Sequence, residues 1–400
     1  MAHLIIRNIG PIKNVEIDLN RINVFMGPQS CGKSTIAKII SYCAWFEKNV
    51  ILKNKPKKNF YHELIEFHNL EDTYFSEDSY IEYVTPCCHI AFKGNDQENP
   101  VMEITLDPKH KFENRKIEYI PAERNFVALK GLGKYTDSRD NILNFLYDWF
   151  QAKQEITPED GFALPLSSLG GAYFYDKERD TDHILLENGR PINLRHSSSG
   201  LMSATPLLVI FDYVMRRVYT QKRTKSPVEL ARIRSFWENL GIKYSEKLNQ
   251  IPELQENLFN LLGLYGDYYY SQVIIEEPEL NLFPKTQIDL VYYMLRVMNE
   301  SQREHVLVLT THSPYILFAL NNCMMGGLVR DKIPPEKAKA FVSHASWVDP
   351  SLVSVYEIHG GCLKRIQDED GIIEDNYLNQ AYKENSSEYL TLLSYFEDEE

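Results

Sequence analysis

The sequence lacks long apolar runs. No stretch comes close to the roughly 18 consecutive apolar residues that a membrane-spanning helix needs, so we expect no transmembrane segment. The opening residues Met-Ala-His-Leu-Ile-Ile-Arg-Asn contain no extended apolar core of the kind that signal peptides carry. We therefore expect a cytoplasmic protein with no membrane partner.

Cysteine is scarce, and its spacing excludes the common metal and redox motifs. No two cysteines form a C-x-x-C pair, and no histidines accompany them at zinc-finger spacing. The adjacent pair Cys87 and Cys88 is expected in a buried strand, and the thiols are expected to be reduced, as is usual in the cytosol. The six cysteines are Cys31, Cys43, Cys87, Cys88, Cys323 and Cys362.

A uniformly positive surface is also absent, because the net charge is -13. This excludes a protein coated with DNA, although a local basic groove stays compatible because binding depends on the local field. Basic residues gather between Arg216 and Arg234, while the segment from Asp368 to Glu400 is acidic with Lys383 as its only base. The basic segment is either a solvated helical face or a contact surface for DNA, RNA or an acidic partner. The acidic segment either solubilises the chain or docks a partner.

The sequence contains one complete phosphate-binding motif, Gly27-Pro-Gln-Ser-Cys-Gly-Lys-Ser34. It has the form G-x-x-x-x-G-K-[ST] and lies between an apolar run, 22–26, and a helix-like segment, 35–42. In that setting, backbone N–H groups and the helix dipole face a phosphate chain. Lys33 is expected to reach the β- and γ-phosphates, and Ser34 is expected to bind Mg²⁺.

Alternating hydrophobicity predicts a β-rich first part of the chain. Residues 3–7 and 15–19 flank a turn and are expected to form a hairpin that leads into the strand at 22–26. Further strands are expected over 80–92, 101–106 and 116–120.

The sequence predicts helices in the middle of the chain. Apolar residues recur at helical spacing over 211–219, 230–240 and 251–262, and none of these segments sustains a heptad, so a compact helical lobe is expected. Two continuous apolar strands follow, at 272–276 and 305–311, with a helix at 286–298 between them. This β–α–β order indicates parallel neighbours in a sheet covered by helices.

Each of these two strands ends in residues that nucleotide hydrolysis would need. Glu276 and Glu277 close the first strand, at the carboxyl edge where open α/β sheets bind ligands. Glu276 is expected to hold the hydration shell of Mg²⁺, and Glu277 to polarise the attacking water as a general base. His312 closes the second strand and is expected to contact the γ-phosphate or that water. The loop Ser197-Ser-Ser-Gly-Leu201 precedes a helix and, taken alone, could be a plain N-cap.

Taken together and in order, these motifs resemble the ATP-binding-cassette (ABC) ATPases of the SMC/RecF/OLD class. Within that class they are most similar to the ATPases of prokaryotic defence systems such as Septu (PtuA) and retron-linked operons. The residues that carry the resemblance are Ile6-Arg-Asn-Ile-Gly-Pro-Ile12, Ile22-Asn-Val-Phe-Met-Gly-Pro-Gln29, Glu276-Glu-Pro-Glu-Leu-Asn-Leu-Phe-Pro284 and Thr311-His-Ser-Pro-Tyr-Ile316.

The resemblance implies ATP and Mg²⁺ as cofactors and gives the matching residues their roles. Glu276 corresponds to the Walker B acid, which with Ser34 serves the metal, while Glu277, His312 and Lys33 correspond to the catalytic glutamate, the switch histidine and the Walker A lysine. Leu280 to Phe283 correspond to the D-loop. The implied nucleotide-binding residues are Gly27, Pro28, Gln29, Ser30, Cys31, Gly32, Lys33, Ser34, Thr35 and, in the signature loop, Ser198, Ser199 and Gly200.

In this class the signature loop contacts ATP on the opposite subunit of a dimer. Here the loop ends in Leu201 where the family usually has Gln or Glu, and we find no counterpart of the family's Q-loop glutamine. Arg124 lies in the segment Tyr119-Ile-Pro-Ala-Glu-Arg-Asn125, which is similar to the defence ATPases. It is expected either near the phosphates or in an ordinary ion pair.

The fold class that follows is α/β: an ABC-ATPase head with a mostly parallel central sheet and an N-terminal antiparallel β lobe. A helical lobe is expected between the signature loop and Walker B, a separation too long for a transporter cassette. The expected division is an N-terminal part of the head (1–200), the helical lobe (201–271), a C-terminal part of the head (272–345) and an extension with the acidic tail (346–400).

The first functional hypothesis is an ATPase that forms a homodimer around ATP and regulates a separate effector, a nuclease or toxin, in antiphage defence. The chain itself has no H-x-H, H-N-H or TOPRIM-like pattern. One alternative is a RecF/SMC-like clamp on DNA, and another is an ATP-dependent scaffold with little turnover. A GTPase is disfavoured, because the nearest N-K-x-D candidate is Asn54-Lys-Pro-Lys57.

Overall fold

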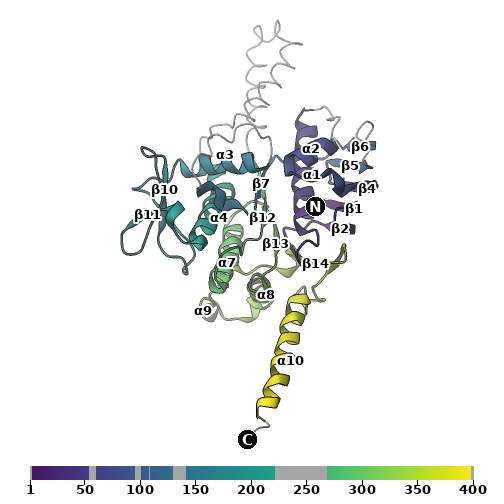
Figure 1. The fold of residues 1–400 in the computed structure, drawn as a ribbon. Coiled ribbons are helices and arrows are strands. Elements are labelled where there is room, and N and C mark those ends of the chain that lie inside the picture. The colour runs from purple at the N-terminus through teal and green to yellow at the C-terminus, as the bar shows by residue number, and fades with distance from the viewer. Residues whose placement is uncertain are drawn as a thin grey trace, which may run out of the picture.

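A sheet of 11 strands forms the centre of the computed structural model (Figure 1), which describes residues 2–53, 60–94, 101–107, 109–128, 141–220 and 268–397. One part of the sheet is parallel and the other is antiparallel. The parallel strands, in spatial order, are β14 (Val353–His359), β3 (Ile22–Met26), β13 (Val306–Thr311), β12 (Tyr270–Glu276) and β7 (Arg115–Ile120). The antiparallel strands are β6 (Val101–Leu106), β5 (Cys88–Lys93), β4 (Phe75–Val84), β1 (His3–Ile9) and β2 (Ile12–Asp18). Strand β15 (Cys362–Arg365) joins the two parts, pairing with β14 and β2.

Both faces of the parallel strands are buried, as their continuous apolar sequences predict. In β3, Ile22, Val24 and Met26 belong to one hydrophobic core, whereas Phe25 belongs to the core on the other face. Helices α1 (Lys33–Lys53) and α2 (Phe60–His68) cover the face that contains Phe25. The opposite face is covered by α3 (Asn141–Lys153), α4 (Ser199–Met215), α7 (Pro284–Glu300) and α8 (Pro314–Val329).

The structure confirms the α/β fold class and most of the predicted strands. The hairpin β1–β2, the strands β3, β7, β12 and β13, and the crossover helix α7 all form where the sequence indicates. The stretch 80–92, expected as one extended region, is divided between β4 and β5 because Pro86 cannot continue the hydrogen-bonded ladder.

Two parts of the sheet structure were not predicted. A second sheet of four antiparallel strands precedes α4: β8 (Phe162–Ala163), β9 (Ala172–Asp176), β10 (Thr181–Leu185) and β11 (Pro191–Asn193). The expected boundary at residue 346 is also corrected, because β14 lies beside β3 in the middle of the main sheet. The part of the C-terminal segment that forms β14 therefore belongs to the head.

The predicted helix at 211–219 forms as the end of α4 and the short 3₁₀ helix η5 (Arg217–Tyr219). Its residues are largely buried in the core of the head. The predicted helices at 230–240 and 251–262, and with them most of the expected lobe, lie outside the described residues. After the short α9 (Pro335–Ala338), the described chain ends in α10 (Tyr377–Glu397), which extends away from the body in Figure 1. No helix in the described ranges is long and apolar enough to cross a membrane.

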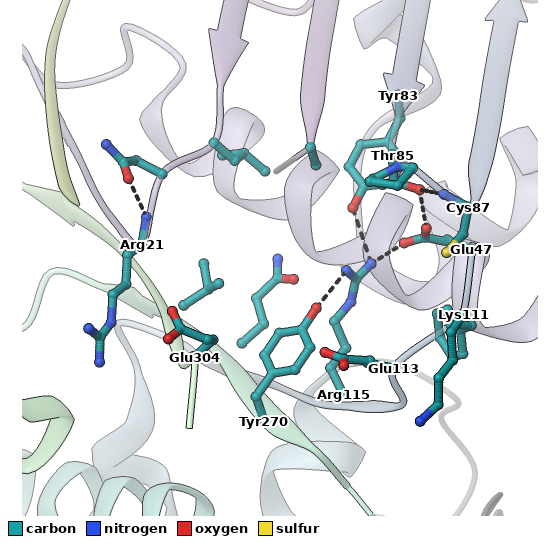
Figure 2. A pocket seen from close by; sticks show the side chains of 17 residues that line it. Arg21, Glu47, Tyr83, Thr85, Cys87, Lys111, Glu113, Arg115, Tyr270 and Glu304 are labelled. Atoms are coloured by element: carbon teal, nitrogen blue, oxygen red, sulfur yellow. Dashed lines mark hydrogen bonds and ion pairs between the residues drawn. The ribbon is translucent and has the colours of Figure 1, made fainter. Parts of the chain in front are cut away.

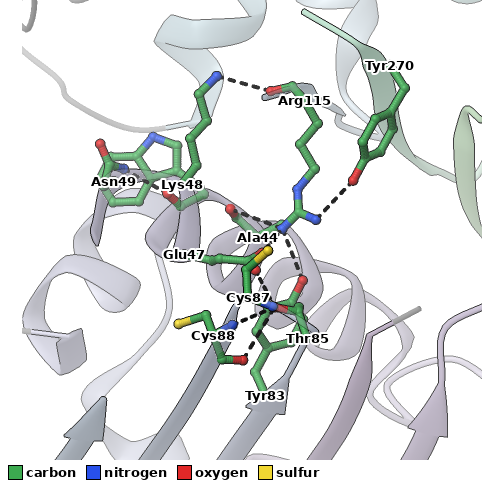
Figure 3. A network of polar contacts seen from close by, with 11 residues as sticks. Ala44, Glu47, Lys48, Asn49, Tyr83, Thr85, Cys87, Cys88, Arg115 and Tyr270 are labelled. Carbon is green, nitrogen blue, oxygen red and sulfur yellow. Dashed lines mark hydrogen bonds and ion pairs between the residues drawn. The ribbon is translucent and has the colours of Figure 1, made fainter. Parts of the chain in front are cut away.

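A buried polar network fastens α1 to the sheet at the amino ends of the parallel strands (Figure 3). The guanidinium of Arg115, at the start of β7, contacts the Glu47 carboxylate of α1. It also donates to the Tyr83 hydroxyl on β4 at 3.1 Å and to the Tyr270 hydroxyl on β12 at 3.2 Å. Glu47 in turn accepts from Thr85. One arginine thus ties the antiparallel part, the parallel part and the helix after the phosphate loop.

Breaking this network from one side is expected to be costly, because it leaves a buried charge without its partner. Glu47→Gln should lower the free energy of unfolding by about 3–5 kcal/mol, and the paired change Glu47→Leu with Arg115→Met should recover much of that loss. Urea unfolding followed by circular dichroism measures both. The exposed ion pair of Lys383 with Asp375 provides the control, since Lys383→Gln should change the stability little. A Glu47→Gln protein as stable as the parent would contradict the assignment.

Candidate nucleotide-binding site

The in-register pairing of the parallel strands brings the predicted motifs to one edge of the sheet. Glu276 of β12 lies opposite Thr310 of β13, and Thr311 lies opposite Met26 of β3. The phosphate loop, the acidic turn and the His312 loop therefore leave the sheet side by side, although the sequence separates them by hundreds of residues.

The phosphate loop has the tight geometry that its glycines predict. Gly32 has a φ of +107°, and a Cβ there would lie 2.9 Å from the Ile12 side chain, so only glycine fits without displacement. Helix α1 begins directly after it, at Lys33. The Lys33 ammonium donates to the carbonyl oxygens of Gly27 at 2.8 Å and Pro28 at 2.7 Å. Burial lowers the pKa of Lys33 from its usual value.

A cavity of about 480 Å³ opens over this loop. Residues 29–35 form its floor, and the turn at Gly10 and Pro11 lies at its margin with Tyr74. The catalytic candidates Glu277 and His312 also line it. The structure therefore brings Lys33, Ser34, Glu277 and His312 to a single cavity.

Glu277 and His312 contact each other at the wall of this cavity. The His312 Nε2 atom lies 3.5 Å from the Glu277 Oε1 atom, and both side chains are about one-third exposed. The hydrogen bond with His312 lowers the pKa of the Glu277 carboxyl, with smaller contributions from the charges of Lys33 and Arg124. Glu277 has a φ of +43°, a left-handed conformation that is costly for a residue with a side chain and that is concentrated at functional sites.

Glu276, the predicted metal residue, is buried just behind Glu277 and does not itself line the cavity. Its Oε1 atom accepts a hydrogen bond from the Tyr119 hydroxyl at 2.5 Å. Burial and the neighbouring Glu276 charge raise the pKa of Tyr119 well above its usual value, so it remains a donor. A carboxylate held in this way and the exposed Ser34 hydroxyl are hard oxygen donors of the kind that Mg²⁺ prefers.

Glu279 is a third carboxylate at this edge of the sheet. It belongs to the motif that begins at Glu276, but no role was predicted for it. Its Oε1 atom accepts from the Thr311 hydroxyl at 2.8 Å and from the backbone N–H of His312 at 2.6 Å. It thus fastens the loop that carries His312 to the acidic turn. Burial raises the pKa of Glu279. Its position two residues after Glu277 is the sequence feature that could have indicated this role.

Arg124 lies in an environment that the sequence did not indicate. This residue is fully buried in η2 (Arg124–Ala128), makes no ion pair within the described residues, and does not line the phosphate cavity. Its guanidinium instead donates to backbone carbonyl oxygens, including those of Glu276 and Glu277, each at 3.0 Å.

The predicted signature loop does not reach the phosphate cavity of its own chain. Ser198 is the N-cap of α4, because its hydroxyl accepts from the Leu201 N–H at 3.3 Å. Ser198 and Ser199 are both exposed. The loop packs beside the expected D-loop, since a Cβ on Gly200 would lie 3.2 Å from the Asn281 carbonyl oxygen. A contact of this loop with ATP on a second subunit stays a prediction.

The first two cations of the basic segment are engaged within the chain. Arg216 pairs with Asp212 and Glu300, and Arg217 pairs with Asp212 and donates to two backbone carbonyls. They are therefore structural in part, and the remaining cations, from Lys222 to Arg234, lie outside the described residues.

A second cavity, of about 340 Å³, lies at the opposite edge of the sheet (Figure 2). Arg21, Arg115 and Tyr270, at the amino ends of β3, β7 and β12, line it together with Glu47. Because the phosphate loop follows the carboxyl end of β3, this cavity is separate from the candidate nucleotide site.

A family model described as an AAA domain matches residues 3–182, somewhat less than half of the chain. No curated protein matches the chain by sequence. Among solved structures, the chain is similar to the SMC head domain from Thermotoga maritima, with 10% identity, a TM-score of 0.41, and coverage of 92% of this chain and 98% of that chain. It is also similar to the recombination mediator protein RecF, with 10% identity, a TM-score of 0.39, and coverage of 91% and 97%. A dimeric ATP-binding cassette with ADP and phosphate gives 12% identity, a TM-score of 0.30, and coverage of 91% and 99%.

Identities this low and TM-scores below 0.5 decide nothing about activity or partners. The match to the AAA-domain model and the geometry of the phosphate loop support the same class, a P-loop ATPase domain on an α/β fold.

Proposed function

We propose that this protein binds and hydrolyses ATP, that it forms a homodimer around ATP, and that it regulates a separate effector in antiphage defence. The observation that carries the hydrolytic part is the contact between Glu277 and His312 at the wall of the cavity formed by the phosphate loop. A nucleotide-binding loop alone explains binding, whereas a paired carboxylate and imidazole beside it provide groups for activating water.

Each residue of the cavity has a chemical role in this proposal. Lys33 would turn from its two loop carbonyls to the β- and γ-phosphates, which are stronger, charged acceptors. Glu277 stays ionised at neutral pH because its pKa is lowered, so it can orient and deprotonate a water molecule. His312 lies close enough to hold that carboxylate and to contact the γ-phosphate. Ser34 and Glu276 would hold Mg²⁺, which neutralises charge on the phosphates when it is bound.

The exposed side of the carboxyl edge supports the proposal of a dimer. Ser198 and Ser199 project from the N-terminus of α4 into solvent, where a helix dipole and free N–H groups favour a phosphate from another molecule. Phe283, in the expected D-loop, is 75% exposed, although a large apolar side chain usually gains from burial. Both features fit an ATP site completed by a second copy of the chain.

The exposed helix α10 supports the proposal of a separate effector. Its outer part presents large apolar side chains to solvent: Tyr382, Tyr389, Leu390, Leu392, Tyr395 and Phe396, each more than 60% exposed. The predicted acidic tail is thus also an apolar surface, and aromatic residues of this kind are enriched at protein interfaces.

A RecF/SMC-like clamp on DNA remains the second candidate, which the same ATPase site supports about as well. A scaffold with little turnover would not need the contact between Glu277 and His312.

Glu277→Gln should retain ATP binding and lower turnover at least about a hundredfold, because the water loses its general base. A phosphate-release assay and calorimetry with ATP measure the two effects. Glu374→Gln, which changes an exposed carboxylate elsewhere, should leave both unchanged. Near-normal hydrolysis by the Glu277→Gln protein would remove this residue from the proposed role.

Ser199→Arg should abolish hydrolysis while the monomer still binds ATP, since the added side chain would block the composite site. Lys33→Ala should itself weaken ATP binding, because a cation facing the phosphates is lost. Mixing the two variants should restore about one active site per heterodimer, from the intact loop of one subunit and the intact signature of the other. If mixed dimers form and no activity returns, the Ser198–Gly200 loop only caps α4.

Replacing Leu390 and Tyr395 by Ser should abolish co-purification with the proposed effector, because the apolar contact surface is lost. The basal ATP turnover should stay unchanged, since α10 contributes nothing to the cavity. Glu384→Gln on the same helix serves as the control. Retention of the partner by the double variant would place the effector contact elsewhere.

A further inference from the structure

Arg124 is a fully buried cation beside the acidic turn, and its hydrogen bonds to the described residues all reach backbone carbonyls. Burying a charge is expensive unless it is paired or fully hydrogen-bonded. A planar guanidinium can satisfy several carbonyls at once because its five donors have a fixed fork geometry. The acceptors are the carbonyl oxygens of Ser203 (3.1 Å from Nε), Pro121 (3.3 Å) and Glu276 (3.0 Å) from Nη1, and Glu277 (3.0 Å) and Pro278 (3.2 Å) from Nη2.

Three of these carbonyls belong to consecutive residues, 276–278, where the chain leaves the sheet. Here Glu277 adopts its left-handed conformation, which costs about 1–3 kcal/mol and persists only when the surroundings fix it. A single hydrogen bond between the Glu277 N–H and the Thr310 carbonyl continues the strand pairing at this point. The contacts with Arg124 add partners on the carbonyl side of the turn, where the Glu277 carbonyl also accepts from the Leu280 N–H at 3.0 Å.

We propose that Arg124 is a positioning residue that holds the 276–278 turn in its left-handed form and couples it to the first turns of α4. The proposal rests on the assignment of hydrolysis to Glu277. It goes beyond that assignment because it names how the position of the Glu277 carboxylate is set and what can change it.

The coupling runs through Ser203, on the helix that begins with the exposed signature loop. The Arg124 Nε donates to the Ser203 carbonyl, and the Asn281 amide donates to the Ser203 hydroxyl at 2.9 Å. Arg124 and Asn281 therefore both contact Ser203 of α4. A shift of α4 when a second subunit engages Ser199 would pull on the turn that carries Glu277.

Two variants separate the fork geometry from the charge. Arg124→Lys keeps a cation but offers one rotatable donor group, whereas Arg124→Gln removes the charge as well. Both should bind ATP with an affinity within about threefold of the parent, while kcat falls at least about tenfold because a misplaced group is inefficient.

The matched control is Arg217→Lys. Arg217 is also an arginine that donates to backbone carbonyls, those of Ala152 at 2.9 Å and Val209 at 3.1 Å, but it lies at the far end of α4 from the acidic turn. Its loss should lower the melting temperature without lowering kcat. This comparison distinguishes positioning from general loss of packing.

A readout without turnover keeps the test independent of the proposed activity. A crystal structure of the Arg124→Gln protein should show residue 277 outside the left-handed conformation that it has in the parent, whereas Arg217→Lys should retain that conformation. If folded Arg124 variants keep kcat and this backbone conformation unchanged, the positioning role is overturned, whereas loss of hydrolysis only in Glu277→Gln leaves the proposed function standing. If Glu277→Gln hydrolyses ATP normally, the proposed function fails while the crystal structure still decides the role of Arg124.

Discussion

The in-register pairing of the parallel strands β12, β13 and β3 is the constraint on which the site depends. Parallel strands end at the same edge of a sheet, so their pairing fixes which residues meet there. Glu276 opposite Thr310, and Thr311 opposite Met26, set the acidic turn and the His312 loop beside the phosphate loop. A register shift in either pair would separate Glu277 from His312 and would also turn the buried side chains to the wrong faces. The geometry of the candidate site is therefore a consequence of the sheet.

Strand β7 connects the two edges of the molecule. At its amino end, Arg115 fastens α1 to the sheet through Glu47, and α1 is the helix that carries Lys33. At its carboxyl end, Tyr119 orients the Glu276 carboxylate, and Arg124 follows directly in η2. The same strand thus supports the phosphate loop from behind and the acidic turn from beside it. Buried hydrogen bonds and ion pairs of this kind make such supports rigid, which a preorganised site requires.

The charges at the nucleotide edge are arranged so that Glu277 stays available. Glu276 is engaged by Tyr119, and Glu279 is engaged by Thr311 and the His312 backbone. Arg124 contributes positive charge without forming an ion pair with any of the three carboxylates that the structure describes there, because its donors reach backbone carbonyls. Only His312 contacts the Glu277 carboxylate among the described side chains, through a bond long enough to be exchanged for water. The carboxylates that are held by hydrogen bonds, Glu276 and Glu279, therefore differ from Glu277, the carboxylate that is proposed to react.

The sequence by itself determined the phosphate loop, the strands on either side of it, and the residues Glu276, Glu277 and His312 at strand ends. These are local signals, in which glycine spacing and continuous apolar runs report the backbone directly. Only the tertiary structure decided that Tyr119 holds Glu276, that Glu279 fastens the His312 loop, and that Arg124 donates to the carbonyls of the acidic turn. It also decided the place of β14 in the sheet and the existence of the four-stranded sheet before α4, whose strands of two to five residues carry too little periodicity to read. Strand order and buried hydrogen bonds depend on partners that are distant in the chain, and no local pattern records which partner will be chosen.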